Sequence, residues 1–95
     1  MVPLKVKFVG AMRHLSGKNQ FVVNSPVGFS VKKLVMSLSQ EFPALENTLC
    51  DRELNDSRSN SLILVNGREI SVLDGLETIL CDGDEIVFVP VVHGG

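Results

Sequence analysis

Only one stretch of this chain, between Ser30 and Pro43, has a sustained helical pattern of apolar residues. Apolar positions there recur three, four and seven apart, which places them on one face of a helix. Ser30 suits the N-cap position, and Pro43 ends the helix because the residue before a proline disfavours helical geometry. A helix of about three turns can cover one face of a small sheet and no more. The predicted helix spans residues 31–42, with Val31, Leu34, Val35, Leu38 and Phe42 on its apolar face.

Short apolar runs on both sides of this helix predict the strands of a sheet. Asn66-Gly67 is a strong hairpin signal because both residues tolerate positive φ, and residues 82–84 predict a tight turn. Residues 72–80 are expected to form an irregular connector that carries Leu76 and Ile79 into the core. The predicted strands are residues 4–9, 20–24, 61–65, 68–70 and 85–90, with a short helical turn at 11–17 that Gly17 closes.

Together these elements predict an α+β fold in which one main helix packs on a mixed sheet of four to five strands. The 95 residues suffice for one core, and no internal repeat is present. We therefore expect a single domain over residues 1–95, with a flexible C-terminal tail from about residue 91 to residue 95.

Two of the predicted strands are apolar on both sides. Ile63 and Val65 alternate with two leucines in one strand, and Ile86 and Phe88 alternate with Val87 and Val89 in the other. Because side chains alternate between the faces of a sheet, each strand carries an apolar set on either face. One helix covers only one face, so the other set stays partly exposed near the tail and predicts a protein-docking surface. The alternative is that the polar loop 51–60 folds over it.

Charge and composition exclude several classes of function. The net charge is −2 and the chain has neither Trp nor Tyr, so it offers no basic stripe for phosphates and no stacking platform for bases. We therefore expect no direct nucleic-acid partner. No apolar stretch reaches the length of a membrane span, and residues 1–7 lack the apolar core of a signal peptide. We expect a soluble cytoplasmic protein with no membrane partner.

The two cysteines, Cys50 and Cys81, lie far apart and neither belongs to a CxxC pair. Zinc sites and iron–sulfur clusters need about four ligands, so we predict no metal site and set aside an electron carrier of the ferredoxin type. Both cysteines are expected to be buried free thiols of a reducing compartment. The chain also offers no catalytic constellation, and we predict no catalytic residue.

The sequence closes with Gly94-Gly95, a short distance after the predicted strand 85–90. A glycine pair packs against nothing and is costly to order, so a frayed end is one interpretation. The other is that the terminal carboxylate is the working group. Two residues without Cβ let an extended tail enter a narrow channel on another protein and leave the carboxyl carbon open to attack.

Three motifs in order resemble the MoaD/ThiS family of ubiquitin-like sulfur carriers. They are Asn66-Gly67-Arg68-Glu69-Ile70, Leu73-Asp74-Gly75-Leu76, and the run from Asp82-Gly83-Asp84-Glu85 through Pro90 to Gly94-Gly95. The resemblance covers nearly the whole chain and implies a β-grasp fold. It also implies that an ATP-using enzyme of the ubiquitin-activating type adenylates the carboxylate of Gly95, after which sulfur replaces an oxygen to give a thiocarboxylate. The chain itself would bind no cofactor, since the partner enzyme uses the ATP.

The same resemblance implies further partners and leaves the acceptor open. Many molybdopterin-synthase small subunits end in Pro-Pro-Val-Ser-Gly-Gly or similar. This chain has His93 before the glycine pair, and in this position it is similar to the ubiquitin-related modifier of tRNA thiolation. Related archaeal small modifier proteins are also attached to lysines. The acceptor is thus a pterin precursor on the large subunit of molybdopterin synthase, a tRNA uridine on a thiolation enzyme, or a lysine conjugated through Gly95. A ubiquitin-like binding module that is never activated is the alternative from another class.

The candidate site is therefore the end of the chain and the strand that leads to it. Gly95 and Gly94 form the activated end. His93 could act as a general base, but a solvated tail histidine is the favoured interpretation. The residues assigned to the tail and to partner docking are His93, Val92, Val91, Pro90, Val89 and Val87.

Overall fold

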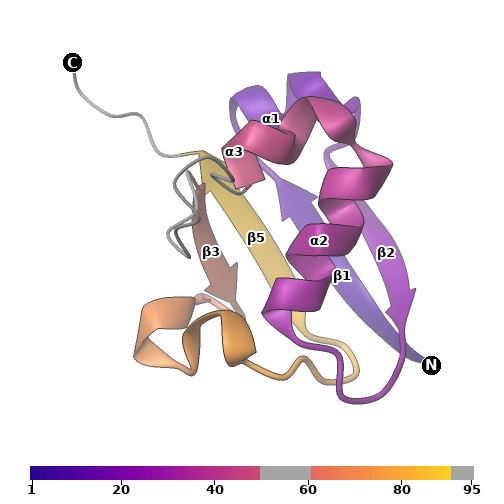
Figure 1. The fold of residues 1–95 in the computed structure, drawn as a ribbon, viewed down its shortest axis with the longest axis vertical. Coiled ribbons are helices and arrows are strands. Elements are labelled where there is room, and N and C mark those ends of the chain that lie inside the picture. The colour runs from indigo at the N-terminus through magenta and orange to yellow at the C-terminus, as the bar shows by residue number, and fades with distance from the viewer. Residues whose placement is uncertain (50–60, 91–95) are drawn as a thin grey trace.

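The main helix, α2, crosses one face of a five-stranded mixed sheet in this computed structural model (Figure 1). The structure describes residues 1–49 and 61–90. The strands are β1 (Val2–Phe8), β2 (Gln20–Ser25), β3 (Ser61–Val65), β4 (Arg68–Glu69) and β5 (Glu85–Pro90). The helices are α1 (Ala11–Ser16), α2 (Val31–Glu41) and α3 (Glu46–Leu49), with 3₁₀ turns at Pro43–Leu45, Ile70–Val72 and Gly75–Glu77. The predicted α+β architecture with one main helix is confirmed.

Helix α2 begins and ends where its sequence signals indicate. The hydroxyl of Ser30 accepts a hydrogen bond from the backbone N–H of Lys33 at 3.2 Å, which is an N-cap. The helix ends at Glu41, one residue earlier than predicted, because Phe42 before the proline has φ −123°. Phe42 still packs partly buried against the core. Of the predicted apolar face, the fully helical members Val31, Leu34, Val35 and Leu38 are all buried.

Strand β5 lies in the middle of the sheet, whose order is β2-β1-β5-β3-β4. It pairs in parallel with β1 and antiparallel with β3. Strand β1 begins two residues before the predicted start, and β4 has only two residues because Ile70 enters a 3₁₀ turn. The chain therefore reaches its C-terminal segment from a central strand that is held on both sides.

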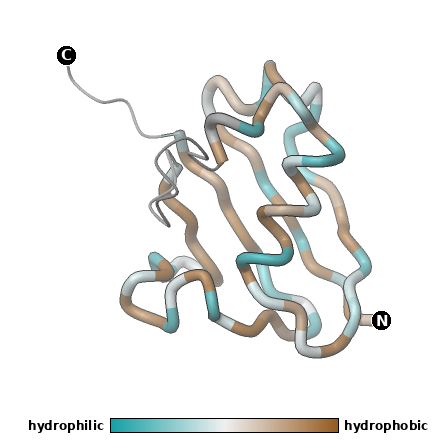
Figure 2. Tube along the Cα trace, viewed as in Figure 1, coloured by the Kyte–Doolittle hydropathy of each residue, from teal (hydrophilic) through white to brown (hydrophobic). Residues whose placement is uncertain are grey.

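The core lies between the inner face of the sheet and α2, where apolar side chains meet from both layers. The rings of Phe21, Phe42 and Phe88 surround Phe8, with centroid distances of 5.5, 5.7 and 5.8 Å. Figure 2 shows that β3 and β5 are hydrophobic over most of their length. The buried apolar residues are Leu4, Val6, Phe8, Met12, Val31, Leu34, Val35, Leu38, Leu45, Leu49, Ile63, Val65, Ile70, Leu80, Ile86 and Phe88.

The connector before β5 differs from its predicted packing. Ile79, expected in the core, is 54% exposed, and its neighbour Leu80 is 1% exposed instead. The reason is an isolated antiparallel β-bridge between Ile79 and Ser30 at the start of α2. In this bridge the Leu80 N–H donates a hydrogen bond to Phe29 O at 2.8 Å. Because side chains alternate along such an extended segment, the bridge directs Leu80 inward and Ile79 outward. The same segment makes Cys81 exposed, so the prediction that it is buried was wrong. Cys50 lies outside the described residues.

Candidate interaction face and end of the central strand

The face of the sheet opposite α2 carries an apolar strip on two neighbouring strands. We define the outer apolar strip as Leu62 and Leu64 of β3 with Val87 and Val89 of β5. Leu62 pairs with Val89 and Leu64 with Val87, so the four side chains form two cross-strand pairs on one face. Leu62 is 38% exposed and the other three are half-buried. The predicted second apolar set is thus present and partly open to solvent, whereas loop 51–60, the proposed cover, lies outside the described residues.

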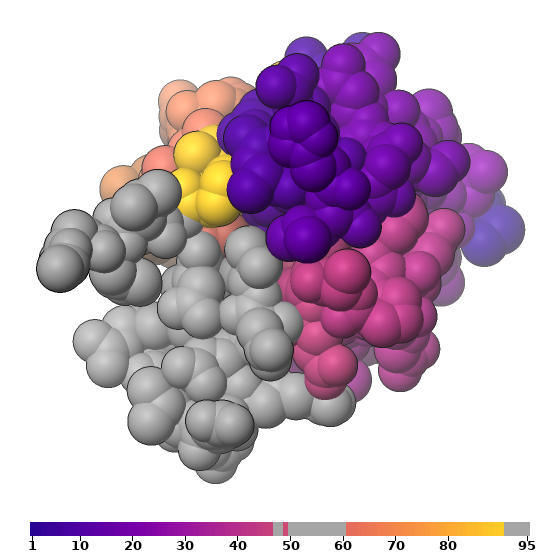
Figure 3. Space-filling model, turned by 90° about the horizontal axis from the view of Figure 1, so that it is seen from above, coloured from indigo at the N-terminus to yellow at the C-terminus, as the bar shows by residue number. Residues whose placement is uncertain are grey.

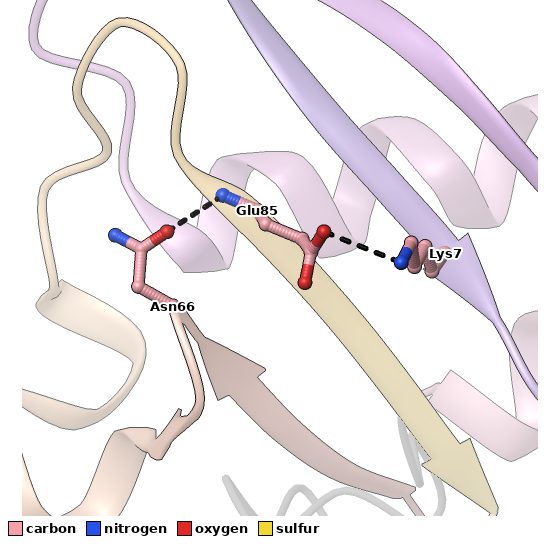
Figure 4. Close-up of polar contacts among 3 residues, drawn as sticks. All are labelled: Lys7, Asn66 and Glu85. Atoms are coloured by element: carbon pink, nitrogen blue, oxygen red, sulfur yellow. Dashed lines mark hydrogen bonds and ion pairs between the residues drawn. The ribbon is translucent and has the colours of Figure 1, made fainter.

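Polar side chains border the outer apolar strip on the β1 side. The ammonium of Lys7 lies 3.3 Å from a carboxylate oxygen of Glu85, and both side chains are more than one-third exposed (Figure 4). Lys7 is also the register partner of Val87, so this ion pair lies directly beside the strip. A patch with an apolar centre and a charged margin is the usual anatomy of a protein-binding surface.

Two turns lock the start of β5 in place. The side-chain NH₂ of Asn66 donates to Asp84 Oδ1 at 2.8 Å. Its side-chain carbonyl oxygen accepts from the Glu85 N–H at 2.9 Å (Figure 4). The Asn66 N–H donates to Glu85 O at 2.8 Å, while Asp84 Oδ2 accepts from the Cys81 N–H at 2.8 Å. Asn66 has φ 52°, as its hairpin position requires. The sequence predicted both turns, but it did not predict that they bond to each other.

At its other end β5 meets the start of α1. The Val9 N–H donates to Phe88 O at 3.3 Å, and Pro90 lies against Gly10. Figure 3 shows the end of β5, in yellow, beside the indigo N-terminal part of the chain. The sequence indicated only that Gly10 breaks the first strand. Its spatial partner is 80 positions away in the numbering, and no local signal could have identified it.

The structure thus describes three of the predicted docking residues. Val87, Val89 and Pro90 lie on one continuous strand, with the two valines on the outer face. The remaining predicted site residues lie outside the described residues: Val91, Val92, His93, Gly94 and Gly95.

Other features of the described residues offer little chemistry. Within 1–49 and 61–90, no three His, Cys, Asp or Glu side chains lie together as a metal site, and no helix is long and apolar enough to cross a membrane. A shallow, open depression beside α1 is lined by Arg13, His14 and Lys18. Arg13 belongs to the last turn of α1, where a cation stabilises the helix dipole.

Comparison with known proteins identifies relatives along the whole chain. The model of the ThiS family matches residues 6–95. Small archaeal modifier protein 3 of Haloferax volcanii is 30% identical over 92 residues, which is 97% of this chain and 98% of that protein.

Solved structures agree with this result. The solution structure of small archaeal modifier protein 1 from Methanosarcina acetivorans has a TM-score of 0.81 at 31% identity, covering 100% of this chain and 98% of that one. A chain in the complex of subunits 1 and 2 of molybdopterin-converting factor from Helicobacter pylori has a TM-score of 0.60 at 26% identity, covering 99% and 100%. The fold is therefore the ubiquitin-like β-grasp, as predicted.

Proposed function

Because this chain belongs to the ThiS family of ubiquitin-like sulfur carriers and modifiers, we propose that it is a carrier activated at the carboxylate of Gly95. One observation carries the proposal: the family match extends to residue 95 and so includes Gly94 and Gly95. In this function the body presents the end of the chain, and an adenylating enzyme of the ubiquitin-activating type binds ATP and supplies the catalytic groups.

The proposed chemistry follows from the weakness of a carboxylate as an electrophile. A Gly95 oxygen attacks the α-phosphorus of ATP, and pyrophosphate leaves. The resulting acyl adenylate has AMP as a good leaving group. A hydrosulfide equivalent then attacks the carbonyl carbon and expels AMP, which leaves a thiocarboxylate. Glycine at positions 94 and 95 suits this chemistry because it places no side chain beside the reacting carbon.

We assign the outer apolar strip to partner docking in the same function. Leu62 and the three half-buried members form a contiguous apolar surface on β3 and on β5, the strand that leads to the tail. A partner that binds this strip holds the body at a fixed distance from its own active site. The similarity to a chain of the two-subunit molybdopterin-converting factor supports such a docking role.

Two kinds of transfer remain within the proposal, sulfur transfer and conjugation to lysines, and different relatives favour each. Sulfur transfer to a pterin precursor or a tRNA uridine fits the ThiS-family match and the molybdopterin-converting factor. Conjugation of Gly95 to protein lysines is the second candidate function, supported by the 30% identity to small archaeal modifier protein 3. Both begin with the same adenylate.

The test uses the full chain with ATP, magnesium, a sulfide donor and an adenylating enzyme of the ubiquitin-activating type from the same organism. Intact-mass analysis should show a gain equal to the mass difference between sulfur and oxygen. Deletion of Gly95, or conversion of its carboxylate to an amide, should abolish that gain. Lys32→Ala is the control, because Lys32 is exposed on α2 and belongs neither to the tail nor to the outer apolar strip.

A wild-type chain that forms neither adenylate nor thiocarboxylate would favour the binding module that is never activated. If activation occurs, the acceptor is identified next. Isopeptide adducts on lysines in a cell extract favour conjugation, whereas a stable complex with a larger subunit favours sulfur transfer to a pterin.

A further inference from the structure

The contact between Gly10 and Pro90 joins the start of α1 to the last described residue of β5. A Cβ built on Gly10 would lie 3.2 Å from Pro90 Cγ and 3.6 Å from Pro90 Cδ. The shorter separation is tighter than ordinary van der Waals contact, so the proline ring packs on the bare glycine backbone. A side chain at position 10 would have to displace the ring.

The backbone of Gly10 also requires glycine. Its φ of 61° and ψ of −140° are the mirror image of an extended conformation, which residues with a Cβ hardly adopt. This geometry lets the chain leave β1 and enter α1, where the Arg13 N–H donates to Gly10 O at 3.1 Å. Glycine at position 10 therefore allows the backbone turn between β1 and α1 and also leaves room for the ring of Pro90.

Pro90 ends the hydrogen-bond ladder between β5 and β1. The N–H of Lys5 donates to Asp84 O at 2.9 Å, and that of Val9 donates to Phe88 O at 3.3 Å. In a parallel ladder with this phase, the next bond would run from the N–H of residue 90 to Val9 O. Proline has no N–H, so the ladder stops there.

From these observations we propose that the Gly10–Pro90 contact positions the activated terminus. The ring on the glycine fixes where and in which direction the chain leaves the sheet, and the missing N–H keeps β5 from pairing further with β1. This inference rests on the proposed function of Gly95. A fixed starting point raises the fraction of docked complexes in which the terminal carboxylate reaches the partner's active site. Gly10 and Pro90 are positioning residues, not catalytic ones.

Four variants separate this role from plain backbone strain: Gly10→Ala, Pro90→Ala, the double variant and Gly17→Ala. Gly17 is the control because it also has positive φ, at 74°, and lies at the other end of α1. Nothing lies within 4 Å of a Cβ built there, so Gly17→Ala strains the backbone without touching β5.

The first readout needs no activity. In Pro90→Ala the new amide should bond Val9 O and become protected from hydrogen exchange. In Gly10→Ala the NMR signals of Pro90 and Val91 should shift, whereas in Gly17→Ala they should not. An unprotected amide at position 90 in Pro90→Ala would show that the missing N–H of proline is not what ends the pairing of β5 with β1. Unchanged NMR signals in Gly10→Ala would overturn the contact between Gly10 and Pro90.

The second readout is ATP–pyrophosphate exchange with the adenylating enzyme, corrected for the folded fraction measured by circular dichroism. Gly10→Ala should lower kcat by roughly three- to tenfold and change KM less than about twofold, since the docking face is intact. Pro90→Ala should also lower kcat. The kcat of the double variant should be higher than that of Gly10→Ala, because the Cβ at position 10 no longer clashes with the proline ring. Gly17→Ala should match the wild type.

Equal losses in Gly10→Ala and Gly17→Ala would assign the effect to strain and overturn the positioning role. Absence of ATP–pyrophosphate exchange with the wild-type chain has a different meaning. It would reject activation at Gly95, and with it the positioning role, while the hydrogen-exchange result would still decide the structural contact.

Discussion

The two faces of β3 and β5 carry the same kind of side chain in different surroundings. Ile63 is 1% exposed in the core, whereas Leu62, the preceding residue, is 38% exposed on the outer face. On the covered face the apolar side chains form the core and stabilise the domain. On the open face they gain less from folding, since water still reaches them. A contiguous strip of this kind fits the partner docking that we propose for this face.

The largest expected effect is on the covered face. Ile63→Ala should destabilise the domain by about 2–5 kcal/mol, because it removes a fully buried side chain and leaves a cavity. Chemical denaturation followed by circular dichroism measures this change. Partner affinity, compared under conditions in which the variant is folded, should stay close to that of the wild type.

The matching change on the open face should have the opposite profile. Leu62→Ala should change stability by less than about 1 kcal/mol, because the side chain is already partly solvated. It should weaken binding to the adenylating enzyme by roughly fivefold to thirtyfold, as calorimetry can measure.

Charge on the same face should sharpen this contrast. Val87→Asp or Val89→Asp introduces a carboxylate into the strip and should remove most of the affinity. Unchanged partner affinity in both aspartate variants would refute the proposed docking role of this face. A large loss of stability in Leu62→Ala would mean that the two faces do not differ as proposed.

The smallest effect should come from the polar margin. Lys7→Ala removes an ion pair of 3.3 Å whose side chains are both more than one-third exposed. Solvent and salt screen such pairs, so the loss of stability should be at most about 1 kcal/mol and should shrink as salt is added. Thermal unfolding at low and high ionic strength checks this, and a loss that does not depend on salt would indicate a packing role for the Lys7 stem instead.

Much of this architecture could be predicted because it depends on local patterns. The helical period at 31–42, the N-cap at Ser30 and the hairpin at Asn66-Gly67 are short-range signals, and each is present in the structure. The alternation in β3 and β5 likewise predicted an apolar set on each face. Local patterns failed at the connector, where Ile79 and Leu80 are both apolar and only the bridge to Ser30 decides which one is buried.

The sequence alone therefore determined the elements, the two-faced apolar strands and the resemblance that points to Gly95, because each depends on residues close together in the chain. The tertiary structure decided which face α2 covers, how Asn66 bonds the turn at Asp84, and that Pro90 rests on Gly10. These are contacts between segments far apart in the chain. They arise only when the central parallel pairing of β1 and β5 brings the two ends of the fold together.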